Sequence, residues 1–434
     1  MIEEAKRLLK GKVDSYEMYY TYGSELSLEA DLGSIRHVAS GDTSGIGIRV
    51  LVGNRLGAAQ ASNIKELKQC VKNAIEIAKA SKPDKNYNFA SPGEYTKRQK
   101  PKAAVLNVDV DKAASFMDRV NKAVKSVSRK INVSSGMFSK DYNTVRLVNS
   151  EGLDVEDEAA LLSYSAELVY KDKHMSDSTS FTLAERFPFK AMGAKEHAER
   201  LLSLVNRGDV KTQTCQVLLK PRALASFLDE CYGFSVSARN IREGKSVIKK
   251  GQKVFDKAVN IVDDASTKGL FCTSRFDDEG TASKSFDVIK NGVFKQPLYD
   301  LYSARKDNVK STGNCHRMSL SSTAILPNNV IFMPGNKDDL VGEIDEGIIV
   351  NEVLGQHMID SATGNFSLGV LEGYYVKKGE IKHAVKDAMI AGNFFKMLGK
   401  VDGIGNKQRH VVAGSGGMYL PEVLCNQIRV IGQG

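Results

Sequence analysis

The stretch LKPRALASFLDECYGFSVSARNIREGKS, from Leu219 to Ser246, decides how the second half of the chain is interpreted. A short apolar run ends at Pro221, and a helical pattern then begins in which apolar side chains recur at i, i+3, i+4, i+7 and i+8. Proline is favoured as the first helical residue, and Gly233 is a natural end for the helix. The pattern therefore predicts an amphipathic helix over 221–232. Its apolar face consists of Leu224, Phe227, Leu228, Cys231 and Tyr232.

The second half of the chain, from about residue 212, is rich in short β-branched runs. Turn signals such as Asn291-Gly292 and Pro334-Gly335 separate these runs at short intervals. Such spacing is typical of a β-sandwich or a barrel-like domain. We expect the helix over 221–232 and another helix near 384–398 to pack on this domain.

The sequence of the first half predicts a helix, several strands and a helix, and the same order then recurs. Amphipathic helices are expected over 2–11 and 64–78, with alternating apolar strand residues between them. Gly53-Asn54 is expected to form a two-residue hairpin turn between two of these strands. The second round has, in order, a helix over 111–127, strands near 131–139, 144–149 and 160–170, and a helix over 189–206. Strands that follow one another, with helices beside them, favour an α+β fold with an internal duplication over a doubly wound sheet.

Two domains follow from this division of the chain. We expect an N-terminal α+β domain over 1–208, with a polar surface connection at 81–102. The C-terminal β-rich domain is expected over 209–434 and carries the helix that begins at Pro221.

The segment Gly45-Ile46-Gly47-Ile48-Arg49-Val50 places two glycines within a strand pattern. It is not a dinucleotide-binding fingerprint, because Val50 stands where the third glycine belongs and no helix begins there. We therefore expect Gly45 and Gly47 to let another segment pack closely on the strand.

The composition is that of an ordinary globular protein, with 42% apolar and 26% charged residues. The first twenty residues are charged and lack the apolar core of a secretory signal, and no apolar run is long enough to cross a bilayer. Six scattered cysteines without a CxxC pair indicate reduced thiols. We therefore expect a cytoplasmic protein without a membrane partner.

The net charge of +9 is spread along the chain among acidic residues. Short basic groups such as Lys249-Lys250 lack the interleaved aromatic residues of a nucleic-acid surface. Nucleic acid is therefore not an expected partner, whereas acidic peptides or a more acidic partner subunit are.

Several short polar blocks in the second half carry a further signal. In chain order they are Asp277-Asp278-Glu279-Gly280, Asn291-Gly292-Val293, Thr312-Gly313-Asn314, Asn328 with Pro334-Gly335, Leu354-Gly355-Gln356-His357, Thr363-Gly364-Asn365-Phe366-Ser367, Gly379-Glu380-Ile381 and Ala391-Gly392-Asn393. Together with the strand at 45–50, they make the chain resemble the TldD/PmbA family over nearly its whole length. Within that family it resembles the PmbA branch, also called TldE.

In the TldD branch of that family, two histidines of a His-Glu-x-x-x-His helix and a cysteine after Gly-Ile-Gly-Asn hold a metal. The resemblance places Asp229, Phe234 and Lys407 at those three positions, and Glu230 at the position of the general base. A phenyl ring has no donor atom, an ammonium repels a cation, and one carboxylate alone does not hold zinc. We therefore expect this chain to bind no metal or other cofactor and to carry no catalytic residue, with zinc in a partner subunit.

The same positions lead to an expectation about helix geometry. Residues five apart on a regular α-helix diverge by about 140°, so metal ligands at 229 and 234 would need a widened turn. Without a metal, we expect no such distortion in the helix over 221–232.

The resemblance implies a non-catalytic subunit of a TldD/TldE-type zinc metallopeptidase heterodimer. Such a subunit shapes the active-site chamber and helps to bind an unfolded peptide, for which strand addition is a suitable mode. Besides the helix at 229–234, two loops are expected to face the partner or the peptide, and their residues are Thr363, Gly364, Asn365, Phe366, Ser367, Gly403, Gly405, Asn406 and Lys407.

Other hypotheses stay open at this point. The chain could be a metallopeptidase on its own with a rearranged ligand set, such as His316 and His357 with nearby carboxylates. It could also be a DNA-topology modulator that binds nucleic acid, as older naming of the family suggests. For the chain alone, a closed two-fold homodimer is a further alternative.

Overall fold

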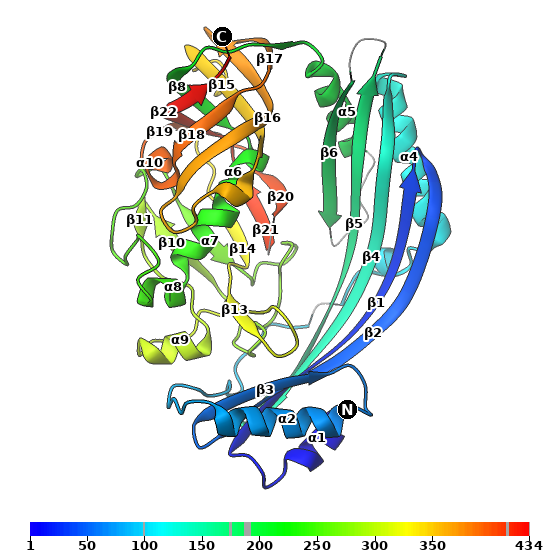
Figure 1. Cartoon of the computed structure of the whole chain (residues 1–434), viewed down its shortest axis with the longest axis vertical. Helices are drawn as coiled ribbons and strands as arrows, with labels where there is room; N and C mark the ends of the chain where they lie inside the picture. The colour runs from blue at the N-terminus through cyan, green and yellow to red at the C-terminus, as the bar shows by residue number, and fades with distance from the viewer. Residues whose placement is uncertain (99, 173–175, 186–191, 414–415, 434) are drawn as a thin grey trace.

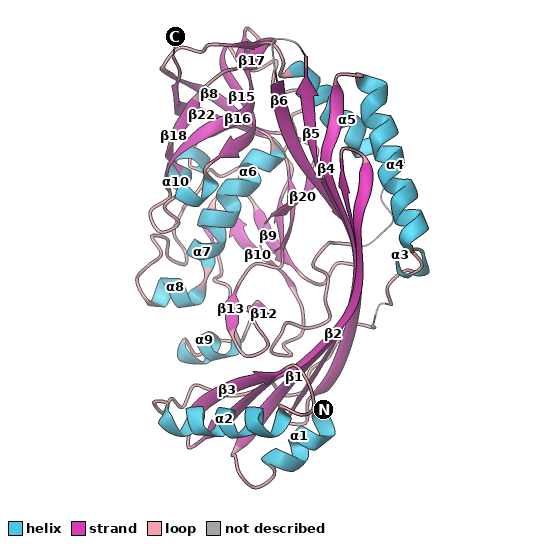
Figure 2. Cartoon of the chain, turned by 45° about the vertical axis from the view of Figure 1, so that its right-hand side comes forward, coloured by secondary structure: helices cyan, strands magenta, loops and turns pink. Residues whose placement is uncertain are grey.

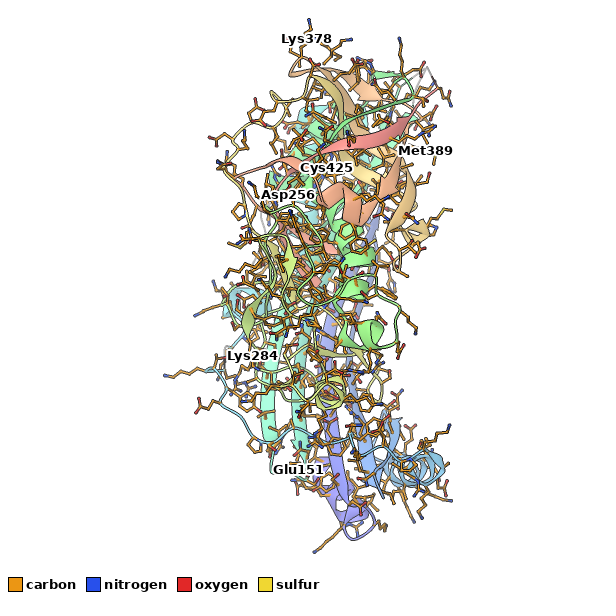
Figure 3. The ribbon with its side chains drawn as sticks, turned by 90° about the vertical axis from the view of Figure 1, so that its left-hand side faces the viewer. Glu151, Asp256, Lys284, Lys378, Met389 and Cys425 are labelled. Atoms are coloured by element: carbon orange, nitrogen blue, oxygen red, sulfur yellow. The ribbon has the colours of Figure 1, made fainter. Side chains whose placement is uncertain are left out.

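The computed structural model describes residues 1–98, 100–172, 176–185, 192–413 and 416–433. A long arched sheet from the first half of the chain stands beside the β-rich second half (Figure 1). Figure 3 shows Lys378 at one end of the molecule and Glu151 near the other. No helix formed by these residues is long and apolar enough to span a membrane.

Six strands of the first half form one antiparallel sheet in the order β3-β2-β1-β4-β5-β6. Their bounds are β1 Ser15–Asp31, β2 Ser34–Val52, β3 Arg55–Ala61, β4 Ile131–Asn149, β5 Asp154–Lys171 and β6 Ser176–Glu185. The helices of this half are α1 Ile2–Leu9, α2 Leu67–Ala80, α3 Ala103–Leu106, α4 Val110–Val127 and α5 Met192–Ser203. The predicted α+β class and the repeated order of helix, strands and helix are confirmed, and the two rounds share one sheet because β1 pairs with β4.

The strands of this sheet are longer than the sequence predicts, and their division differs. The predicted strands near 131–139 and 144–149 are both part of β4, because polar residues between them still pair with β1 and β5. The strand β6 was not predicted. The predicted helix over 189–206 is shorter, and its residues 189–191 lie outside the described residues.

Each end of the sheet has its own apolar core. At one end, α1 and α2 cover β1, β2 and β3, with Ile48 and Val71 in the core. At the other end, α4 and α5 cover β4 and β5, with Val120 and Leu168 in the core. Figure 2 shows α4 on the face of the sheet that points away from the second half of the chain. The opposite face is therefore left for the second half to dock on.

The turn between β2 and β3 is the predicted two-residue hairpin. Gly53 and Asn54 both have positive φ, of 57° and 58°. A turn with two consecutive left-handed residues matches the right-handed twist of the strands, and glycine and asparagine accept that conformation most readily.

The second half contains a closed five-stranded barrel, in agreement with the predicted barrel-like domain. Its strands follow one another in the order β15-β8-β22-β18-β16, and β16 pairs back to β15. Their bounds are β8 Gln213–Leu219, β15 Glu346–Leu354, β16 Asn365–Lys377, β18 Met389–Asn393 and β22 Val423–Ile431. Beside it lie β7 Arg207–Gly208, β17 Glu380–Val385 and β19 Val401–Ile404.

A second six-stranded sheet in this half has the order β11-β10-β9-β14-β21-β20. Its bounds are β9 Ile261–Asp264, β10 Ser285–Lys290, β11 Val293–Phe294, β14 Asn329–Phe332, β20 Arg409–Ala413 and β21 Gly416–Leu420. A two-stranded ribbon consists of β12 Cys315–Arg317 and β13 Thr323–Ile325. The remaining helices are α6 Pro221–Phe227, η1 Leu228–Tyr232, α7 Gly233–Val236, α8 Ala238–Arg242, α9 Leu301–Lys306, η2 Gln356–Met358 and α10 Phe394–Leu398.

The predicted helix near 384–398 is wrong over most of its length. Only α10 is helical, because Asn393 caps a helix start with its side chain, which accepts from the amides of Phe395 and Lys396. The preceding residues pair with β16 and β22 as the barrel strand β18. Pairing within the barrel therefore overrides the helical periodicity of this segment.

The second half docks on the sheet through a close backbone contact and a buried ion network. A Cβ atom at Gly47 would clash with the carbonyl of Leu320, which confirms that this strand glycine allows close packing. Arg49 on β2 donates to Glu279 at 3.0 Å and lies 3.4 Å from Glu17 on β1. Arg317 pairs with the same Glu17 carboxylate.

The four charged residues of this network are buried. Burial alone would lower the pKa of Arg49, but the charges of Glu17 and Glu279 outweigh it and raise that pKa. Asp278 adds to the contact, since it accepts from the hydroxyl of Tyr19 at 2.8 Å and the amide of Arg317 at 2.7 Å. The block Asp277-Asp278-Glu279-Gly280 is therefore one of the segments by which the second half attaches to the sheet.

Replacement of Arg49 by methionine tests this network. It leaves the carboxylates of Glu17 and Glu279 buried without that cation, so we expect the free energy of unfolding to fall by about 3–5 kcal/mol. Urea denaturation followed by far-UV circular dichroism measures the loss. The exposed pair of Arg146 and Asp154 supplies the control: Arg146→Met is expected to cost at most about 1 kcal/mol, and equal losses for the two variants would contradict this account.

Candidate functional site

The helix that begins at Pro221 does not end at Gly233. It continues through a π-helical turn, η1, into α7, and Gly233 itself has helical φ and ψ of −55° and −41°. The amide of Gly233 donates to the carbonyl of Leu228, five residues earlier. The prediction of an undistorted helix that stops at Gly233 is therefore wrong.

The widened turn is held by packing at both ends of the helix. At its start, the amide of Lys220 donates to the carbonyl of Val350 in β15. At its end, Leu298 donates to the carbonyl of Val236 at 2.9 Å and accepts from the amide of Ala238 at 3.0 Å. Because the residues between these anchors are also packed in the core, the extra residue is taken up as a π-turn.

The π-turn brings residues five apart to the same side of the helix. Asp229, Glu230 and Phe234 line one cavity of about 490 Å³. The other lining residues are Leu228, Gly233, Ser237, Arg239, Asn240, Met318, Ala324, Ile325, Leu326, Pro327, Asn328, Val330, Ser361, Gly416, Gly417 and Met418. Sequence reasoning missed most of this second group, although Asn328 belongs to a family block.

A buried carboxylate fixes the wall opposite the helix. Asp263 accepts from the amide of Asn328 at 2.8 Å and from the side-chain amides of Asn328 and Asn314 at 2.9 and 3.0 Å. Burial raises the pKa of Asp263, and these donors oppose the rise. Asn314 also donates to the carbonyl of Leu326. The blocks around Asn314 and Asn328 therefore shape the cavity and do not form isolated turns.

The cavity is mainly apolar, with two carboxyl groups at the widened turn. Burial raises the pKa of Asp229. Burial and the charge of Asp229 raise the pKa of Glu230, while His357 and Ser361 act in the opposite direction. Among the described residues neither carboxylate has an ion pair, and the nearby Arg239 pairs with Asp300. These carboxylates are therefore available to a ligand that carries positive charge or hydrogen-bond donors.

The donor set at this wall does not fit a zinc ion. Phe234 supplies no donor atom at the position that converges with Asp229. Within the described part of the chain, no group of three or more His, Cys, Asp and Glu side chains could hold a metal. His316 lies near Asp263 and His357 near Glu230, so the two histidines act on different carboxylates.

The loop at 363–367 lies beside the cavity, because Ser361, two residues before it, lines the cavity. Phe366 points into the core, where its ring meets that of Phe227 at 4.8 Å. Gly364 has a φ of 79°, and its backbone bonds to Asp360 and Phe394 fix the turn. The exposed members of the loop are Thr363, Asn365 and Ser367.

The second predicted loop lies away from the cavity wall. Gly403 and Gly405 are buried, and Gly405 bonds to Gly335 and Glu422 through its backbone. Asn406 donates to Asp338, and Lys407 is exposed. None of these residues lines the cavity. The structure therefore brings Asp229, Glu230 and Phe234 together and leaves Lys407 outside their cavity.

The chain matches three successive domains of one protein family. Residues 212–432 match "PmbA/TldA metallopeptidase C-terminal domain", residues 16–78 match domain 1, and residues 104–205 match the central domain.

Relatives resemble the chain over nearly its full length. An uncharacterised protein of Methanocaldococcus jannaschii is 29% identical over 91% of this chain and 93% of its own. Metalloprotease PmbA of Escherichia coli O157:H7 is 25% identical over 97% of this chain and 94% of its own. The crystal structure of TldE from Thermococcus kodakarensis superposes with a TM-score of 0.92 at 21% identity, covering 99% of this chain and all of that one, so the fold is shared.

The raised pKa of Asp229 predicts a pH-dependent effect of Asp229→Asn. A carboxyl whose folded pKa lies above its unfolded value favours the folded state at low pH, and that contribution is lost as pH rises through the folded pKa. The variant should therefore raise the urea midpoint at pH 7 and leave it unchanged at about pH 3.5, below the ordinary pKa of aspartate. The exposed Asp118 serves as control: Asp118→Asn should not raise the midpoint at either pH, and a gain equal to that of Asp229→Asn would contradict the interpretation.

The π-turn also predicts that two histidines placed five apart will converge. The double variant Asp229→His/Phe234→His should bind Zn²⁺ about tenfold more tightly than the same spacing on the regular helix α4, in Asp118→His/Ala123→His. Competition with a chromophoric chelator measures both affinities. Equal binding by the two pairs would show that the turn does not bring the side chains together.

Proposed function

Because the chain belongs to the PmbA/TldD metallopeptidase family, we propose that it is the non-catalytic subunit of a peptidase complex. A TldD-type partner supplies the zinc and the chemistry. The observation that carries this proposal is the wall at the widened turn, where Asp229 and Phe234 converge on one cavity. The shape of a two-ligand site is present there, while a phenyl ring stands where a donor atom is needed.

The cavity is suited to receive a side chain of an unfolded peptide. Its volume of about 490 Å³ is in the range of small-ligand pockets. Leu228, Phe234, Met318 and Met418 give it an apolar lining, and methionine adapts to side chains of different shape. Such a surface selects for exposed apolar groups rather than for one sequence, as an unfolded substrate requires.

Exposed apolar side chains near the predicted partner-facing loop support a partner on this side. Leu354 is 61% exposed and Met358 70% exposed, and both flank His357, which lies near Glu230. Contiguous exposed apolar groups mark sites of protein contact. The proposal keeps Thr363, Asn365 and Ser367 as partner- or peptide-facing residues, and it places the complex in the cytoplasm.

The direct test is reconstitution with a TldD-type subunit. We expect the mixture to cleave an unfolded peptide at least about tenfold faster than either chain alone, because the second subunit completes the binding surface. A discontinuous assay of peptide fragments measures the rates. Equal rates for the partner alone and for the mixture would overturn the subunit role, and cleavage by this chain alone would favour an independent metallopeptidase.

A blocking variant tests whether the cavity takes part. Ser361→Trp places a bulky side chain at its wall, so we expect the mixture to lose most of its gain in rate while the two chains still associate. Ser126→Trp on the exposed side of α4 is the matched control and should leave the gain intact. Full activity with Ser361→Trp would exclude the cavity from substrate binding.

A further inference from the structure

A second cavity lies between the two halves of the chain and has a different character. Its volume is about 450 Å³, and its wall includes residues from the end of β6, from α5, from the start of α6 and from β20. None of the family blocks noted in the sequence supplies its charged residues. The cavity is therefore separate from the one at the widened turn.

Four cationic side chains from different segments line this second cavity. They are Arg200 on α5, Lys220 and Arg222 at the start of α6, and Arg409 on β20. Among the described residues, the carboxylates that line it are Glu196 and Glu422, which pair with Arg409 and Lys220 at 2.6 Å. The wall therefore carries an excess of positive charge.

Arg200 and Arg222 each form an ion pair with a glutamate outside the cavity lining. Arg200 pairs with the buried Glu372 at 2.7 Å, and Arg222 pairs with Glu352 at 2.7 Å. Neither glutamate lines the cavity. Each guanidinium has five N–H donors in a rigid fork. One edge can therefore bind the glutamate while N–H groups on another edge remain for a ligand.

One histidine at the wall, His197, responds to this charge. Arg200 donates to Nδ1 of His197 at 2.6 Å, and the imidazole of His197 stacks on Phe181 with ring centres 4.5 Å apart. Burial, together with the charges of Arg200, Arg222 and Arg409, lowers the pKa of His197 to about 3. The side chain is therefore neutral at pH 7 and adds no charge of its own.

The second histidine supplies a polar group without a partner. Nε2 of His410 is buried and makes no hydrogen bond within the described residues. Its ring stacks on Tyr419 at 4.9 Å, which fixes its orientation. Nε2 faces Gly417 of β21 and is covered by protein, so this histidine shapes the wall and the arginines carry the recognition of a ligand.

We propose that this cavity binds the carboxylate end of a peptide. Arginine forks match a carboxylate in two parallel hydrogen bonds, and partly buried charge-assisted bonds of this kind are the strong ones. Apolar wall residues, Leu183, Val411 and Val412, provide room for the side chain next to that carboxylate. The inference rests on the proposed function, because peptide ends are what a peptidase complex takes in and releases.

Binding of matched peptides to the full chain tests this site. The probes are one unstructured peptide labelled at its N-terminus, with a free C-terminal carboxylate, and the same peptide as its C-terminal amide. Fluorescence anisotropy at fixed salt should show the acid bound about tenfold more tightly than the amide, the ratio expected for the loss of a charge-assisted hydrogen bond. Equal affinities would overturn the proposal without any variant.

Charge-matched variants locate the effect. Arg222→Gln/Arg409→Gln removes two guanidinium groups from the wall, at side chains that are partly or largely exposed, and should abolish the preference for the acid. Lys400→Gln/Arg429→Gln removes two charges from exposed positions elsewhere and should retain it. A preference that survives the first pair, or disappears with the control pair, would contradict the site.

Inorganic phosphate separates a peptide site from a general anion site. It should displace the labelled acid only at concentrations far above those of an unlabelled peptide acid, and equal potency would overturn the assignment to peptides. Failure here is distinguishable from failure of the proposed function. A chain that accelerates its partner but binds acid and amide equally refutes only this cavity, and the reverse result refutes only the subunit role.

Discussion

The buried ion network around Arg49 is the constraint on which the rest of the structure depends. It joins Glu17 and Arg49 of the long sheet to Glu279 and Arg317 of the second half, away from solvent. Such groups are costly to bury, so they hold only one arrangement in which every charge meets its partner. With Gly47 permitting contact with Leu320, the network sets how the second half stands on the sheet.

The widened helical turn shows that a fold can bring two side chains together as in a metal site without supplying metal-binding side chains. Asp229 and Phe234 converge although Phe234 cannot ligate a metal, because backbone bonds to Val350 and Leu298 anchor the helix at its two ends. The fold therefore keeps a cavity at the widened turn, lined by carboxyl groups and apolar side chains in place of a set of metal ligands. This is the physical basis for assigning it to substrate binding in a complex with a catalytic subunit.

The sequence allowed the α+β class, the repeated unit, the Gly53-Asn54 hairpin and the barrel-like second half to be predicted, because these depend on local periodicity and turn chemistry. The π-turn could not be predicted, since tertiary anchors and not propensity decide it. The sequence predicts too long a helix near 384–398, because the pairing of 389–393 within the barrel is a long-range effect that local periodicity does not show. Likewise Arg49 and Asp277 to Glu279 carry no local signal of their contact. The two-domain division at 208–209 stays a prediction.

The two cavities differ in charge. One offers Asp229 and Glu230 beside apolar side chains, and the other offers arginines and neutral histidines. The most direct measurement is a crystal structure of this chain with a TldD-type partner and a peptide, with diffraction data at the zinc edge. The account predicts zinc held by the partner alone, with peptide density against the Asp229–Phe234 wall. Zinc coordinated by Asp229 or Glu230 of this chain would contradict it.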